Sequence, residues 1–145
     1  LGLPTLVYRM KTQEQSAIQL SEFLNTVPDV IDVKFPGLPS HPQYELAKSQ
    51  MKIIPSVLTI TLKSAEKAEQ LIRNTKLFGE KVSFGTSDSR LEIPSKMSHA
   101  TYSEEDLKKI GLTHATVRIS VGLENIDDLI VDIQQALKIE TTKYV

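Results

Sequence analysis

Arg118 is the side chain of this sequence whose position carries the clearest chemical meaning. It lies between two small hydroxyl residues, Thr116 and Ser120, and alternates with apolar residues at positions 117, 119 and 121. This period of two predicts a strand with one apolar face and puts Arg118 on the polar face. Two interpretations stay open from this stretch alone. Either the face is solvated, or the guanidinium is a cation fixed on a rigid element and directed at a carboxylate.

The histidines give weaker signals. His41, His99 and His114 have no metal-ligand spacing with one another or with carboxylates. We expect His41 to be structural or exposed, and His99 to bond a backbone carbonyl rather than to act as a general base. The sequence has no glycine-rich phosphate loop, paired-carboxylate motif or nucleophile elbow. Because it has no cysteine, thiol catalysis and thiolate metal sites are excluded.

Four stretches alternate as strands do, at residues 30–35, 56–63, 77–84 and 116–121, with a brief extended piece at 90–93. Each shows one polar face, and Ser83 projects from the polar side of the third. Helical patterns separate the strands. A sheet covered on one side only is typical of an antiparallel or mixed arrangement. The pattern therefore predicts an α+β domain with a small, mainly antiparallel sheet of about four strands and helices on one face.

The helices carry recognisable start signals. Pro4 opens a first helix that runs to Leu24, with Glu14 interrupting its apolar stripe. Ser40 and Gln43 predict a capping box for a helix at residues 44–51. Further N-caps are predicted at Ser64, Ser103 and Asn125.

Composition excludes several classes of protein. The chain has 145 residues, 24% of them charged, with a net charge of -1 and no long apolar run. There is thus no basic excess for nucleic acid and no candidate membrane span. The lack of cysteine fits a reducing cytosol, so a cytoplasmic location is expected. Because the chain opens at Leu1 without an initiator Met, we expect a piece of a longer protein.

Several motifs together resemble one family. Residues 35–48 are similar to "YPGLPSHPQHELAK", residues 96–100 to "MTHA", and residues 117–124 to "RLSVGLED". Residues 2–10 resemble "GLKTL..RM", and residues 127–137 resemble "EDLI.DL.QAL". The motifs resemble those of the Cys/Met metabolism family of pyridoxal-phosphate enzymes, which includes cystathionine γ-lyase, cystathionine β-lyase, cystathionine γ-synthase, methionine γ-lyase and the homoserine sulfhydrylases. The resemblance covers nearly the whole chain in order.

The resemblance implies that residues 1–145 are a single C-terminal domain of a fold-type-I enzyme. The pyridoxal-phosphate-binding large domain and its cofactor lysine would lie upstream, so this piece alone is expected to be inactive and to hold no covalent cofactor. The implied reaction is β- or γ-elimination or replacement at a C–S or C–O bond of a sulfur amino acid. A homo-oligomer, typically a tetramer, is implied for the complete enzyme. The "TKY" at residues 142–144 resembles a cofactor motif but follows the last helix, and we interpret it as chance.

Two residues match family positions that bind the substrate. Arg118 matches the arginine that holds the α-carboxylate, and Ser83 matches the serine of "SLGG" beside it. We expect both side chains on one face of the sheet, with no carboxylate of the domain occupying the guanidinium. In the complete enzyme the large domain would cover part of the first helix, so in this piece that surface should be exposed. Its poorly covered residues would be Leu3, Leu6, Val7 and Met10.

Departures from the family motifs leave the subfamily open. Ile54, Pro55 and Ser56 replace a glycine pair, and Thr86 replaces the second glycine of "SLGG". Val82 stands where cystathionine γ-lyases commonly have a glutamate, which disfavours that member. The alternative to an enzyme domain is a stand-alone interaction or regulatory domain that catalyses no reaction. Upstream sequence with a Ser-x-Thr-Lys motif would favour the enzyme.

Overall fold

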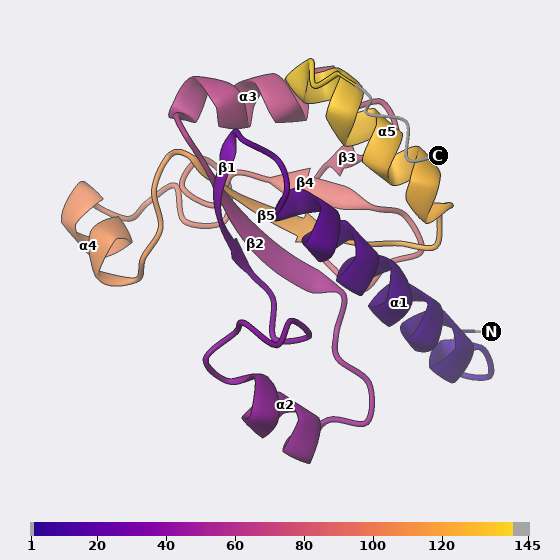
Figure 1. The fold of residues 1–145 in the computed structure, drawn as a ribbon. Helices are drawn as coiled ribbons and strands as arrows, with labels where there is room; N and C mark the ends of the chain where they lie inside the picture. Colours follow the sequence, from indigo (N-terminus) through magenta and orange to yellow (C-terminus); the bar gives the residue numbers. More distant parts are fainter. Residues whose placement is uncertain (1, 141–145) are drawn as a thin grey trace.

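The computed structural model describes residues 2–140, which form five helices and five strands (Figure 1). In chain order these are α1 (Leu6–Leu24), β1 (Val30–Lys34), α2 (Tyr44–Gln50), β2 (Val57–Leu62), α3 (Ala65–Asn74), β3 (Gly79–Glu80), β4 (Arg90–Glu92), α4 (Glu104–Lys109), β5 (Thr116–Ser120) and α5 (Ile126–Leu137).

The strands form one mixed sheet in the order β1-β2-β5-β4-β3. The pairs β1–β2, β2–β5 and β5–β4 are antiparallel, and β3 pairs with β4 in parallel. The prediction of an α+β fold with a mainly antiparallel sheet is confirmed, with one strand more than the four expected. The extra strand is β4, which the sequence showed only as a brief extended piece. β5 is therefore the central strand.

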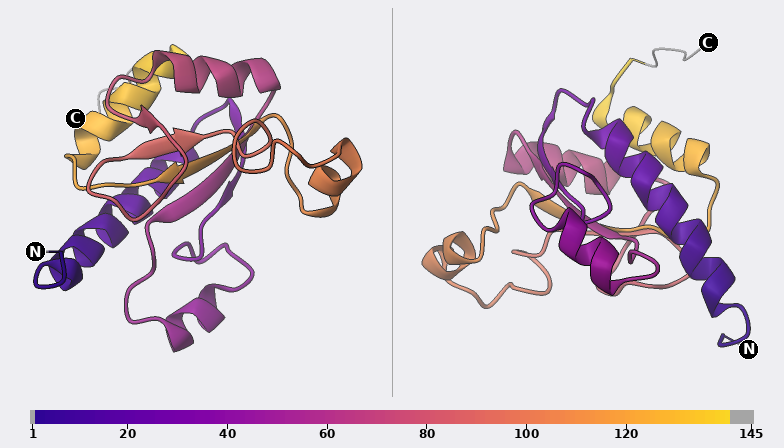
Figure 2. Two further views of the ribbon diagram at one scale, coloured as in Figure 1. Left: turned by 180° about the vertical axis from the view of Figure 1, so that it is seen from behind. Right: turned by 60° about the horizontal axis from the view of Figure 1, so that its bottom comes forward.

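One face of the sheet carries the hydrophobic core. Helices α1, α3 and α5 cover it, whereas α2 and α4 lie apart from this layer (Figures 1 and 2). Val117, Ile119 and Val121 are buried there against Leu129 and Ile133 of α5. Each fully buried aliphatic side chain contributes about 1.5–3 kcal/mol. The predicted apolar face of β5 is thus confirmed. The three helices cover only this face, so the polar face of the sheet lies on the other side.

Three helices begin where the sequence predicts. Ser64 accepts a hydrogen bond from Lys67 N, Ser103 from Asp106 N, and Asn125 from the N–H groups of Asp127 and Asp128. The capping box at Ser40 is wrong. α2 begins only at Tyr44, so its N-cap is Gln43 and Ser40 lies three residues too early to cap it. Gln43 makes no side-chain cap hydrogen bond, and its N–H donates to Nδ1 of His41 in the preceding turn.

Two strands also differ from expectation. The stretch 77–84 pairs only over Gly79–Glu80, so Ser83 lies in the loop that follows β3. A register irregularity between Val30 and Asp32 turns Ile31 outward, where it is 63% exposed. Strict alternation over residues 30–35 would put Ile31 on the inner face with Val33 and Phe35. The extra residue in one strand of the pair breaks this alternation, so that prediction is wrong for Ile31.

The polar residues in the middle of α1 serve as anchors. Gln13 is buried and donates to the carbonyl of Thr86, and Glu14 accepts a hydrogen bond from Ile54 N at 2.7 Å. These contacts explain why the apolar stripe of α1 is interrupted at Glu14. They tie the helix to the loops before β2 and β4.

Candidate functional site

Arg118 occupies the middle of the central strand, on the face opposite the helix layer. Its cross-strand partners are Thr59 on β2 and Glu92 on β4. Its neighbours Val117 and Ile119 are fully buried in the core, whereas the Arg118 side chain is 23% exposed. The predicted place of the guanidinium on the polar face is therefore confirmed.

Glu92 contradicts the expectation that no carboxylate of the domain occupies Arg118. Its Oε1 lies 2.7 Å from Nη2 of Arg118, and its side chain is only 2% exposed. Residues directly opposite on adjacent strands share a face, with Cβ atoms about 5 Å apart. The sequence could not reveal this pair, because the two residues meet only through the register of β4 against β5.

The segment after β3 passes over the same face. The ring centroid of Phe84 lies 5.4 Å from Cζ of Arg118, within the range of a cation–π contact. Gly85 N donates to Oγ of Ser120, which shares the face of Arg118 because it is two residues further along the strand. The segment 84–85 therefore flanks the guanidinium.

Ser83 immediately precedes this segment and is exposed, with a φ of 139°. A positive φ is rare for a residue with a Cβ and is found most often at functional sites and tight turns. The prediction that Ser83 projects from a strand is wrong. That its hydroxyl shares a site with Arg118 stays a prediction, supported by the position of Phe84.

A polar cluster fixes the loop between β3 and β4. Glu124 accepts hydrogen bonds from the N–H and the hydroxyl of Ser89, and Ser89 Oγ in turn accepts one from Gly122 N. The Arg90 guanidinium donates to both carboxylate oxygens of Asp88. This contact, aided by Thr86, lowers the pKa of Asp88 from 3.8 to about 2. The loop is thereby tied to the start of α5 and to the edge of the site.

The histidines have structural partners. His41 Nδ1 accepts from Gln43 N, in line with the structural role expected. His99 Nδ1 lies 2.9 Å from Ser98 Oγ, so its ring partner is a hydroxyl and not the backbone carbonyl predicted.

His114 joins a chain of polar side chains that the sequence did not reveal. Its Nδ1 lies 2.9 Å from Ser95 Oγ and its Nε2 lies 2.7 Å from Glu104 Oε1. Ser95 is buried, at 7% exposure, and is poorly placed to meet a substrate. These two hydrogen bonds link α4 to the segment after β4.

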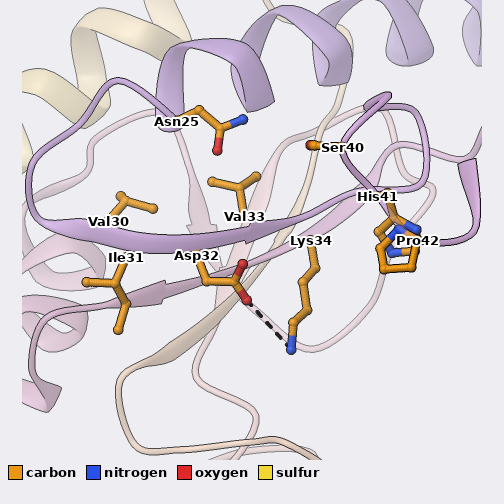
Figure 3. A pocket seen from close by; sticks show the side chains of 9 residues that line it. All are labelled: Asn25, Val30, Ile31, Asp32, Val33, Lys34, Ser40, His41 and Pro42. Atoms are coloured by element: carbon orange, nitrogen blue, oxygen red, sulfur yellow. Dashed lines mark ion pairs between the residues drawn. The ribbon is translucent and has the colours of Figure 1, made fainter.

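A hollow of about 520 Å³ lies beside the outer strand β1 (Figure 3). Asp32 and Lys34, which form an exposed ion pair at 3.7 Å, line it together with His41 and Pro42. Because β2 separates β1 from β5, this hollow is distinct from the surroundings of Arg118.

No helix of residues 2–140 is long and apolar enough to cross a membrane. Within the same residues, no group of three or more histidine, aspartate or glutamate side chains is arranged to hold a metal ion. The "TKY" at residues 142–144 lies outside the described residues.

Known proteins resemble this chain over almost all of its length. It is 41% identical over 137 residues to cystathionine gamma-lyase of Dictyostelium discoideum, covering 94% of this chain and 35% of that protein. It is 39% identical over 138 residues to L-methionine gamma-lyase of Fusobacterium nucleatum, with shares of 94% and 35%. The chain therefore spans about a third of the length of these relatives.

A solved structure supports the same relationship. The crystal structure of a putative O-acetylhomoserine (thiol)-lyase from Campylobacter jejuni, which contains N'-pyridoxyl-lysine-5'-monophosphate, matches with a TM-score of 0.89 and 37% identity. The match covers 94% of this chain and 33% of that one. The model of the family described as Cys/Met metabolism PLP-dependent enzyme matches residues 1–138. The chain therefore belongs to the Cys/Met metabolism family of PLP-dependent enzymes.

Proposed function

We propose that this chain is the C-terminal domain of a larger pyridoxal-phosphate enzyme of sulfur amino-acid metabolism, in which it binds the α-carboxylate of the substrate. The observation that carries the proposal is the partly exposed guanidinium of Arg118 on the polar face of the central strand. The match to only a third of each relative supports a further, larger domain. We infer that residues 1–145 fold as one unit of that enzyme.

The proposed reaction is elimination or replacement at the β- or γ-carbon, breaking a C–S or C–O bond. Pyridoxal phosphate, when bound, withdraws electrons from Cα of the amino acid. The residues around Arg118 offer a guanidinium and serine hydroxyls, which suit a carboxylate and not the attachment of an aldehyde cofactor. They fit the substrate end of such a site. The cofactor lysine is assigned to the missing domain.

Arginine suits this role for a geometric reason. Its planar fork binds a carboxylate with two parallel N–H donors, so it fixes the rotation of the substrate as well as its position. Alignment of the bond to be broken is a large part of enzymatic rate enhancement. Ser83, at the entrance of the segment that flanks Arg118, is proposed to donate to the same carboxylate.

The test is kinetic and uses the full-length enzyme loaded with cofactor. Arg118→Ala should lose roughly 2–5 kcal/mol in kcat/KM toward cystathionine or methionine, the scale for removing one partner of a buried charge pair. Arg118→Lys should recover only part of the loss, because an ammonium is a point charge. Arg73→Ala is the matched control, since its side chain is 74% exposed on α3. Near-wild-type kinetics of Arg118→Ala would refute the assignment.

The complete enzyme is proposed to work as a homo-oligomer, typically a tetramer, with an amino acid of the sulfur pathway as its substrate. A cytoplasmic location is also proposed. Family membership favours this function over the stand-alone interaction domain, because the matching relatives are enzymes by name.

A further inference from the structure

Glu92 is a buried acidic residue to which the proposed function assigns no role. Its side chain is 2% exposed, and Ser98 Oγ donates to its Oε1 at 3.2 Å. The same oxygen contacts Arg118. Its second oxygen, Oε2, is buried and has no hydrogen-bond partner among the residues that the structure describes.

Such a carboxylate destabilises the fold unless its charge is offset. Burying an acceptor without a donor is unfavourable, and more so for a charged group. The ion pair with Arg118 offsets part of the desolvation, yet an apolar pair at the same place is often as stable or better. Stability is therefore a weak explanation for Glu92, and its position against Arg118 suggests another.

The contacts of Arg118 show what Glu92 does to the guanidinium. Glu92 holds Nη2 from the neighbouring strand, and the ring of Phe84 lies near the guanidinium carbon. A free arginine side chain loses rotamer entropy when it clamps a ligand. An arginine already held at one nitrogen loses less, and its remaining N–H donors keep a fixed direction.

We propose that Glu92 is a positioning residue for the substrate, acting through Arg118, and that Ser98 fixes Glu92 in turn. This inference rests on the proposed function of Arg118. Glu92 also carries a negative charge close to the place of the incoming carboxylate, which weakens the attraction of Arg118 for any anion. Glu92 therefore has two opposite effects. It orients the guanidinium of Arg118, and it lowers the affinity of Arg118 for carboxylates that make no other contact.

These two effects give Glu92→Gln a signature that a purely structural role would not produce. In the full-length enzyme, kcat per active site should fall by about 10- to 100-fold, the scale for a slightly misplaced group. Competitive inhibition by propionate should become roughly three- to tenfold tighter, because a nearby like charge is gone. Inhibition by 3-methylthiopropylamine, which has no carboxylate, should not change.

A matched control separates this effect from general destabilisation. Asp132 is also buried, where it accepts hydrogen bonds from the N–H groups of Lys76 and Leu77. Asp132→Asn should lower the unfolding temperature and leave kcat per active site and propionate inhibition at wild-type values. Should Glu92→Gln fail to fold, Ser98→Ala serves instead, with the same two changes at smaller size.

The double variant decides whether Glu92 acts through Arg118. In an Arg118→Ala background, Glu92→Gln should produce no further loss of kcat, because the group that Glu92 orients is absent. An independent, additive effect would overturn the inference, as would wild-type kcat and inhibition in Glu92→Gln alone. If Arg118→Ala itself has near-wild-type kinetics, the proposed function fails first. If Arg118→Ala is impaired while Glu92→Gln is not, only the role of Glu92 fails.

Discussion

Gly122 lies directly against the backbone of Ser87 and Asp88. A methyl group added to Gly122 would fall 2.6 Å from the carbonyl carbon of Asp88 and closer still to the carbonyl oxygen of Ser87. Nothing bulkier than hydrogen fits between the end of β5 and the loop before β4. The loop beside Arg118 can therefore pack this closely against the end of β5 only because residue 122 is a glycine.

Gly122→Ala is expected to destabilise the protein by about 1–3 kcal/mol, because backbone atoms must move to admit the methyl group. The measurement is urea denaturation of the purified chain. Gly79→Ala is the control, since its added methyl group would meet only Ser89 O at an ordinary 3.9 Å. Equal stability of the two variants would contradict the close approach at Gly122.

The Asp88–Arg90 pair predicts a pH dependence. The pKa of Asp88 is depressed to about 2, so its stabilising contribution is present above the ordinary value of 3.8 and is lost as the pH falls through about 2. Carbon-13 NMR titration of the carboxyl group should give a midpoint near 2. In Arg90→Gln the midpoint should return toward 3.8, and an unchanged midpoint would show that Arg90 is not the cause.

The start of α1 should be an assembly surface. Leu3 is 81% exposed, Leu6 41%, Val7 55% and Tyr8 75%, while Met10 is half-buried. The sequence predicts poor cover for Leu3, Leu6, Val7 and Met10, and this is confirmed for the first three but not for Met10.

Replacing Leu6 and Val7 by serine should change the unfolding free energy by no more than about 0.5 kcal/mol, because neither is buried. It should reduce self-association of the chain in sedimentation velocity. Leu20→Ala, at a fully buried position of the same helix, should instead cost about 2–5 kcal/mol. Unchanged association would show that another part of the enzyme covers this face.

The chain alone should not attach pyridoxal phosphate at one defined lysine and should not turn over cystathionine or methionine. The reason is that the cofactor lysine is assigned to the missing domain. Borohydride reduction in the presence of the cofactor, followed by peptide mass mapping, should spread label over many lysines. Stoichiometric labelling of one lysine would show that the chain carries its own cofactor site.

Local signals account for the parts of the fold that could be predicted. The caps at Ser64, Ser103 and Asn125 need only a side-chain oxygen and an N–H two or three residues away, so a short window of sequence contains the whole interaction. β2 and β5 have a full apolar face, and both were located within one or two residues. The short strands β3 and β4 have no such face: the alternation at residues 77–84 extends well beyond the two residues of β3 that pair, and residues 90–93 show only a brief extended piece. Their extent depends on pairing with a partner far away in the chain.

For the site, the sequence by itself determined that Arg118 faces away from the core, because burial of its two apolar neighbours leaves a strand residue no other side. The family resemblance drew attention to Arg118 and Ser83. Only the tertiary structure decided what surrounds the guanidinium. Glu92 reaches it through the register of β4 on β5, and Phe84 through a loop that leaves the sheet after two paired residues. Neither contact follows a period in the sequence, since both depend on where distant backbone segments form hydrogen bonds.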